Sequence, residues 1–333
     1  MVTTANYAAR KYGIRSALPI SWAWRLAEAA RRRGEPATVF LQGDHAHYQA
    51  VSARIMAIVA LGADAFEQAS IDEAYLDLSS RGEWGAAETH LRAVKAEIRA
   101  REGLTCSVGL GPNKLVAKIA SDMRKPDGLT VVPTEAVQGF LDPLGIRVLP
   151  GIGPKTEAML HERGIRTIAD LGRVEGSRLT AWFGKWGEDL SRKARGLSDD
   201  PVSNDGERKS VGEQETFERD TLDRTFVTER ARTLANTVFR RSQGDGVAGF
   251  RTVTVTVRFS NFVTTSRSQT VKGSMTTEAE LARTALELLD PFFDARENPR
   301  GRLIRLIGVR VEKLVREAES STTQVGLPLD VGP

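Results

Sequence analysis

The sequence predicts an α+β protein of several domains, and three observations carry this prediction. Strand-like and helical segments alternate between residues 45 and 133, which is typical of α/β or α+β layers. Short helices dominate residues 134–197, and the order β-α-β-β-α-β follows over residues 210–316, which is a compact two-layer pattern. Between the last two parts, the polar stretch LSDDPVSNDGE is rich in breakers and is expected to be a linker.

The bulk properties fit two or three compact cores. The chain has 333 residues, of which 41% are hydrophobic and 27% are charged. A net charge of +4 and a pI near 9.3 permit a polyanionic partner. Cys106 is the single cysteine, so an internal disulfide is excluded and a reducing compartment is indicated. No segment is typical of a signal peptide or a membrane span, so we expect a cytoplasmic protein without a membrane partner. We also expect a monomer.

The first element in chain order is a short helix that carries Tyr7 and Arg10. Residues three apart share one helical face, so this turn could hold a phosphate chain between an aromatic ring and a cation. An ordinary surface helix is the alternative. A second, amphipathic helix is expected to start at Trp22 and end at Gly34.

The stretch SIDEAYLDLS, residues 70–79, places an acidic pair between two runs of strand-forming residues. Neighbouring side chains within a strand point to opposite faces, whereas at the bend of a hairpin both carboxylates could converge. Asp72 and Glu73 would then suit a hard divalent cation that shares oxygen ligands with a phosphate. An acidic pair that simply faces water is the alternative.

The acidic hairpin is expected to belong to the sheet of an α+β layer. Periodicity predicts helices over residues 45–61, 85–101 and 114–123, and strands over residues 104–110 and 129–132. Beyond residue 133 the character changes to short helices.

The segment from Val148 to Leu171 carries the most specific local pattern, PGIGPK followed by LHERGI. Gly151 and Gly153 allow a tight turn whose backbone N–H groups face outward at the start of a helix. Lys155 adds a cation beside that turn. The pattern indicates a helix-hairpin-helix, which grips a nucleic-acid backbone without reading its sequence; a plain helical hairpin is the alternative.

The last domain contains the alternating run TVTVTVRF, residues 252–259. Its valines should face two covering helices, which would leave the threonines and Arg258 on an open face. Arg258 is expected to contact a phosphate backbone, with Arg251, Arg267 and Lys272 nearby. A solvated sheet face is the alternative.

The polar tail, residues 317–333, holds the isolated apolar segment QVGLPL, Gln324–Leu329. Such a segment is typical of a linear peptide that docks in a groove, although a random chain end has much the same pattern.

Taken in order, these pieces resemble the Y-family DNA polymerases of the DinB or DNA polymerase IV branch. The matching segments are TANYAARKYGIRSALPI, SIDEAYLDLS, CSVGLGPNKLVAKIASDMRKPDGL, LPGIGPKTEAMLHERGI and RKSVGEQETF. The resemblance implies a right-hand polymerase architecture with a helical thumb and a β-α-β-β-α-β little finger. Its domains would be fingers (1–44), palm (45–133), thumb (134–197), linker (198–209), little finger (210–316) and flexible tail (317–333).

The resemblance also implies the chemistry of the site. Asp72 would be shared by two Mg²⁺ ions and Glu73 would hold the ion nearest the primer 3′-hydroxyl, while Tyr7, Arg10 and Lys125 would contact the deoxynucleoside triphosphate. The substrate would be primer-template DNA, copied with low fidelity and without proofreading. Gln324–Leu329 resembles the family's peptide for the sliding clamp, although it lacks the aromatic residue often found there.

One departure from the family pattern is important. The family's D-x-D-x-F-F-A strand, which supplies a third metal-binding carboxylate and a central palm strand, does not occur in this sequence. We therefore expect incomplete fingers and palm, in a translesion polymerase whose start lies upstream, and very weak primer extension. The alternatives are an inactive remnant that binds DNA and the clamp, and an unrelated helix-hairpin-helix protein such as a nuclease subunit.

Overall fold

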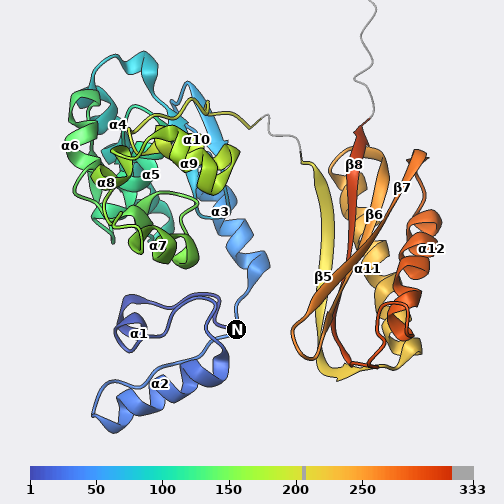
Figure 1. Ribbon diagram of the computed structural model, residues 1–333. Helices are drawn as coiled ribbons and strands as arrows, with labels where there is room; N and C mark the ends of the chain where they lie inside the picture. The colour runs from blue at the N-terminus through green and yellow to red at the C-terminus, as the bar shows by residue number, and fades with distance from the viewer. Residues whose placement is uncertain (205–207, 317–333) are drawn as a thin grey trace, which may run out of the picture. The chain divides into compact units, whose positions relative to one another are not determined.

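The structure is a computed structural model that describes residues 1–204 and 208–316, and it divides into two compact units after Asp205 (Figure 1). The helices of the first unit are α1 (Tyr7–Lys11), α2 (Ile20–Arg32), α3 (His45–Val59), α4 (Trp84–Glu102), α5 (Lys114–Met123), α6 (Val137–Leu141), α7 (Pro154–His161), α8 (Ile168–Gly172), α9 (Gly176–Phe183) and α10 (Lys185–Lys193). Its strands are β1 (Ala65–Gln68), β2 (Ala74–Asp77), β3 (Val108–Leu110) and β4 (Leu129–Val131).

Side-chain caps determine where several of these helices begin. The Asn6 carboxamide oxygen accepts a hydrogen bond from the backbone N–H of Ala9 at 2.9 Å, and Asn113 accepts one from Val116 at 3.0 Å. Such caps satisfy backbone donors that have no partner inside the helix. The predicted start of α5 at residue 114 is confirmed for this reason.

The acidic hairpin forms its own small sheet. Strands β1 and β2 pair antiparallel, with Gln68 opposite Ala74, while β3 and β4 form a separate parallel pair. The expectation that the hairpin lies within a larger sheet is therefore wrong for the described residues. The physical reason is that no described strand lies between β2 and β3 to bridge them. The predicted strand over residues 104–110 is also shorter, because pairing with β4 begins only at Val108.

Helix α5 links the small strands of the first unit to its short helices, α6 to α10. Gly109 lets β3 approach α5 closely, since a Cβ there would lie 2.0 Å from the carbonyl oxygen of Ala117. On its other side, α5 contributes Leu115, Val116 and Ile119 to one core with residues of α6 to α10. Helix α5 therefore packs against β3 on one side and against the short helices on the other.

The second unit is a four-stranded sheet covered by two helices, in the predicted order. It contains β5 (Ser210–Thr221), α11 (Arg224–Gly244), β6 (Val247–Phe259), β7 (Thr264–Met275), α12 (Glu278–Leu289) and β8 (Ile304–Arg316). The sheet order is β5-β8-β6-β7, and every neighbouring pair is antiparallel. Helices α11 and α12 pack against one face of the sheet (Figure 1). Val253, Val255 and Val257 are buried in the core formed with these helices, as their alternation predicted.

The opposite face of this sheet is less open than expected. Thr252 and Thr254 are only 7% and 3% exposed, and the hydroxyl of Thr254 also donates to the Glu312 carboxylate at 3.1 Å. Thr252 and Thr254 bond to Thr270 and Ser268 across the strands at 2.8 and 2.9 Å. Arg267 is not on this face at all, since it lies opposite Val255 and therefore on the helical side.

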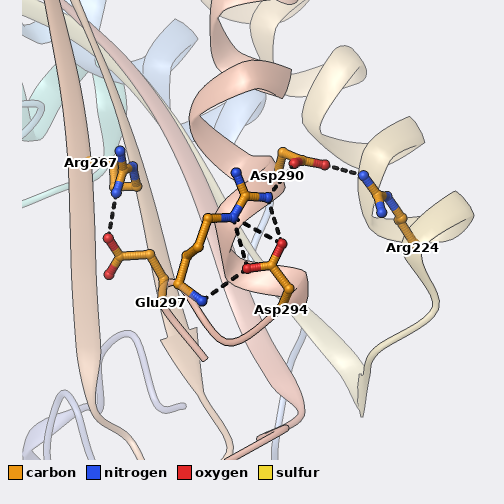
Figure 2. Close-up of polar contacts among 6 residues, drawn as sticks. Arg224, Arg267, Asp290, Asp294 and Glu297 are labelled. Atoms are coloured by element: carbon orange, nitrogen blue, oxygen red, sulfur yellow. Dashed lines mark hydrogen bonds and ion pairs between the residues drawn. The ribbon is translucent and has the colours of Figure 1, made fainter. Parts of the chain in front are cut away.

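The loop after α12 is organised by the arginine–carboxylate contacts that Figure 2 shows. Arg296 contacts Asp290 at 2.7 Å and Asp294 at 2.5 Å, and Arg224 of α11 also pairs with Asp290. Arg267 of β7 contacts Glu297 at 2.5 Å. The hydrogen bonds from Arg296 lower the pKa of Asp294 to about 2. This network connects the loop to both a helix and the edge strand.

Candidate functional site

Asp72 and Glu73 lie at the bend between β1 and β2, and both are exposed. The Ser70 hydroxyl donates a hydrogen bond to the Asp72 carboxylate at 2.7 Å, and Ser70 N donates to the Glu73 carbonyl at 3.1 Å. Below the bend, the buried Ser52 hydroxyl donates to the Ile71 carbonyl at 2.5 Å. The bend is thereby held so that both carboxylates project from one short turn.

Lys118 on α5 is the immediate charge partner of this pair. Its ammonium group forms an ion pair with the Glu73 carboxylate. Burial lowers the pKa of Lys118, but the hydrogen bond to Glu73 and the nearby Asp122 outweigh that effect, so the net pKa is raised. Lys118 is therefore a fixed cation next to the acidic bend. The sequence did not predict this contact, because it joins two residues that are 45 positions apart in the chain.

A cavity of about 960 Å³ opens beside the acidic bend. Its polar rim includes Asp72, Glu73, Lys118, Lys125 and Tyr7. Its apolar wall consists of side chains from α3, α4, β2 and β3, namely Ile55, Leu76, Leu91, Val94, Ile98 and Val108. The structure thus brings four of the predicted metal- and nucleotide-binding residues to one cavity.

Arg10 does not line this cavity, but it is stacked on Tyr7. Its guanidinium lies 5.2 Å from the centre of the Tyr7 ring, and its Nε donates to the Ala5 carbonyl at 2.9 Å. The shared face expected from the i, i+3 spacing is therefore present. Lys125 lies directly after the C-terminus of α5 and contacts Asp122 at 2.5 Å.

The chain after α10 is attached to the acidic hairpin, which the sequence did not predict. Lys114 contacts the Glu67 carboxylate at 2.7 Å and the Pro201 carbonyl at 3.2 Å. Ser203 N donates to the same carboxylate at 3.1 Å. Burial opposes ionisation of Glu67, but these hydrogen bonds outweigh it and lower its pKa. Gln68 N also donates to the Asn204 side chain at 3.0 Å.

The predicted helix-hairpin-helix turn is present before α7. Gly151 has a φ of +100°, a conformation that glycine adopts without strain, and a Cβ there would lie 3.2 Å from the Trp186 ring. Gly153 is the residue before the helix and Lys155 is exposed in its first turn. The first N–H groups of a helix have no acceptor within it. This turn therefore offers donors and a cation to an anionic ligand.

Arg258 is the penultimate residue of β6 in the second unit. Its Nε donates to the Thr264 hydroxyl at 2.9 Å, and among residues 1–204 and 208–316 it forms no ion pair. Its charge is thus available to a phosphate.

The described residues contain two carboxylates at the bend but no cluster of three or more His, Cys, Asp or Glu side chains that could hold a metal ion. Carboxylate oxygens are suitable ligands for Mg²⁺, which usually keeps several waters and takes further oxygens from phosphate groups. The donor set at the bend fits such an ion only with help from other ligands. No helix among the described residues is long and apolar enough to cross a membrane.

Comparison with known families identifies three matching regions. The impB/mucB/samB family matches residues 1–122, and the C-terminal domain of that family matches residues 208–327. The DNA polymerase-iota thumb domain matches residues 147–198, which include the glycine turn.

Individual relatives match over most of the chain. DNA polymerase IV of Methanoculleus marisnigri is 41% identical over 94% of this chain and 83% of its own length. DNA polymerase IV 2 of Methanosarcina mazei is 38% identical over 98% of this chain and 85% of its own length.

Solved structures match in the same way. A Y-family DNA polymerase chimera of Dbh and Dpo4 has a TM-score of 0.83 at 31% identity, covering 95% of this chain and 88% of that one. An insertion ternary complex of Dbh DNA polymerase has a TM-score of 0.63 at 30% identity, with the same coverage. Polymerases of this kind use divalent metal ions and bind DNA and nucleotide. The chain therefore belongs to the DinB branch of the Y-family, the DNA-directed DNA polymerases of translesion synthesis.

Proposed function

We propose that this chain extends a primer along template DNA by Mg²⁺-assisted phosphoryl transfer, with Asp72 and Glu73 as its metal ligands. The observation that carries the proposal is that both carboxylates, Tyr7 and Lys125 line the same cavity. Metal ions held by Asp72 and Glu73 would stabilise the negative charge that develops during in-line phosphoryl transfer. The residues of the chain supply the carboxylate oxygens and position the nucleotide.

The triphosphate is proposed to lie against α1 and the end of α5. Tyr7 and Arg10 form a stacked pair on one face of α1, and the Arg10 guanidinium is proposed to contact a phosphate oxygen. Lys125 supplies a second cation at the same cavity. These contacts hold the substrate while charge develops on the phosphoryl group, and such positioned charge supplies most of the catalysis in phosphoryl transfer.

The DNA backbone is proposed to contact the glycine turn and the second unit. The backbone N–H donors of the turn at Gly151 and Gly153, together with the Lys155 ammonium group, would contact phosphates of one DNA strand. The Arg258 guanidinium would contact another phosphate at the sheet face. We also propose that Gln324–Leu329, which lies outside the described residues, binds the sliding clamp, and that the protein acts as a monomer in the cytoplasm.

Primer extension with Mg²⁺ tests the metal proposal. We expect weak nucleotide incorporation, because the bend offers only two carboxylates. Asp72→Ala should reduce the rate of incorporation by a factor of about 10² or more. Glu88→Ala on α4 is the control, since it removes a half-buried carboxylate that pairs with Arg92 and does not line the cavity.

Two outcomes would count against this proposal. Incorporation that survives Asp72→Ala would remove Asp72 from the metal site. DNA binding without any incorporation, at any Mg²⁺ concentration, would instead support the inactive DNA-binding remnant.

A further inference from the structure

The turn that follows α5, residues 125–128, contributes to the cavity beside the acidic bend. Lys125, Pro126 and Asp127 all line that cavity. Asp127 has a φ of +58°, a conformation that Asp adopts more readily than most residues because its short side chain can form local hydrogen bonds. Since the Lys125 ammonium group is proposed to contact the triphosphate, the contacts that fix this turn decide where that cation lies.

Lys95 of α4 holds the turn without lining the cavity. Its ammonium group donates to the Asp127 carboxylate at 2.6 Å and to the Asp127 carbonyl at 3.2 Å, and it also bonds to the Cys106 carbonyl. An ammonium group has three protons, which match these three acceptors. The Lys95 side chain is only 15% exposed and is not among the residues that line the cavity. It therefore contacts the turn from behind.

Charge strengthens the contact between Lys95 and the turn. The hydrogen bond from Lys95 lowers the pKa of Asp127, with a smaller contribution from Arg99, whose guanidinium lies 3.7 Å from the same carboxylate. Asp127 is therefore ionised at neutral pH. A hydrogen bond between two ionised groups is roughly twice as strong as one between neutral groups.

The position of Lys125 depends on the backbone of this turn. Gly128 approaches the end of α5 closely, since a Cβ there would lie 2.2 Å from the Arg124 carbonyl oxygen, and its own carbonyl accepts a hydrogen bond from Val108 N at 2.9 Å. The Lys125 side chain, by contrast, is 43% exposed and pairs with Asp122 at 2.5 Å, a surface contact that adds little rigidity. The backbone of the turn is thus the fixed part.

From these contacts we propose that Lys95 is a positioning residue for the nucleotide, because it fixes the turn at the place where Lys125 can contact the triphosphate. Lys95 does not touch the substrate, and its effect passes through Lys125. A small displacement of such a contact is costly even when its origin lies away from the reacting atoms. The inference rests on the proposed function, since it takes Lys125 as a phosphate contact.

Binding of a fluorescent deoxynucleoside triphosphate analogue tests this role without catalysis. The full chain is titrated in Mg²⁺ with primer-template DNA whose primer ends in a dideoxynucleotide. We expect Lys95→Met to weaken nucleotide binding about fivefold and to leave the affinity for a blunt duplex unchanged. Lys193→Met is the matched control, because the Lys193 side chain is 20% exposed and pairs with Asp189 at 2.7 Å; it should change neither affinity.

A double-mutant cycle shows whether the effect passes through Lys125. Lys125→Met alone should weaken nucleotide binding, and the addition of Lys95→Met should then have no further effect. A purely structural role of Lys95 would give the same loss with or without Lys125. Asp127→Asn removes the same ion pair and keeps a residue that suits a positive φ. It should also weaken nucleotide binding, and it provides the test if Lys95→Met fails to fold.

The proposal is overturned if Lys95→Met and Asp127→Asn both bind the nucleotide as the wild type does, or if the loss caused by Lys95→Met is the same in the Lys125→Met background. In either case, weaker binding by Lys125→Met would leave the proposed triphosphate contact intact. If Lys125→Met binds the nucleotide as well as the wild type, or if the wild type does not bind it, the proposed contact and the positioning role are both rejected.

Discussion

At the scale of single residues, Lys118 has the most direct influence on the acidic bend. Its ammonium group pairs with Glu73, one of the two carboxylates proposed to hold metal. A divalent cation must therefore compete with a protein cation for the same oxygens. Coulomb attraction at a partly exposed site is modest, so this competition adjusts metal affinity rather than preventing binding.

Lys118→Met should raise the affinity for Mn²⁺, measured by electron paramagnetic resonance, by about two- to fivefold. The control is Lys193→Met, which removes an equal charge from α10, where Lys193 pairs with Asp189 at 2.7 Å. Equal Mn²⁺ affinity in the two variants would show that Lys118 does not compete for the carboxylates.

At the scale of elements, the sequence predicted most helices and strands but not how the small sheets are arranged. The Asn113 cap and the Val/Thr alternation of β6 are local signals, so the start of α5 and the strand β6 could be predicted directly from the sequence. The burial of Thr252 and the helical-side position of Arg267 depend on cross-strand register, which has no local signal. The shared helical face of Tyr7 and Arg10 followed from their spacing, whereas the Glu67–Lys114 contact joins distant segments.

The Glu67 contact gives a prediction for the attachment of residues 201–204. Glu67→Gln should speed hydrogen exchange at the Ser203 and Gln68 amides and lower the free energy of unfolding by about 1 kcal/mol at neutral pH. Glu97→Gln, which disturbs an exposed i, i+4 pair on α4, is the control and should change neither.

The effect of Glu67→Gln should also depend on pH. The folded state lowers the Glu67 pKa below 4.5, so its ionised form stabilises the fold above that value. This stability is lost as the pH falls through the folded-state pKa. Wild type and variant should therefore unfold alike in strong acid. A difference that persists there would show that the carboxylate acts through packing rather than charge.

At the scale of the whole molecule, each of the two units contains one of the cations proposed to contact DNA. Lys155 belongs to the first and Arg258 to the second. Because phosphate contacts release counterions, the logarithm of the affinity should fall linearly with the logarithm of the salt concentration. Replacing Lys155 or Arg258 by alanine should reduce the magnitude of this slope by about 1 each, as titrations with a blunt duplex would show.

The Asp122→Ala variant is a useful comparison, since it removes an anion that pairs with Lys125 and leaves both proposed backbone contacts in place. Salt-insensitive binding by the wild type would contradict the phosphate-contact proposal for both units.

The attachment of residues 201–204 to the acidic hairpin has a consequence for avidity. Residues 198–209 are the predicted linker, and hydrogen bonds to Glu67 and Gln68 attach residues 203 and 204 of it to the first unit. Effective concentration falls roughly as the −3/2 power of connection length, so releasing these residues should lower the effective concentration of one unit near DNA held by the other. Glu67 would thus strengthen DNA binding through chain entropy, without touching DNA.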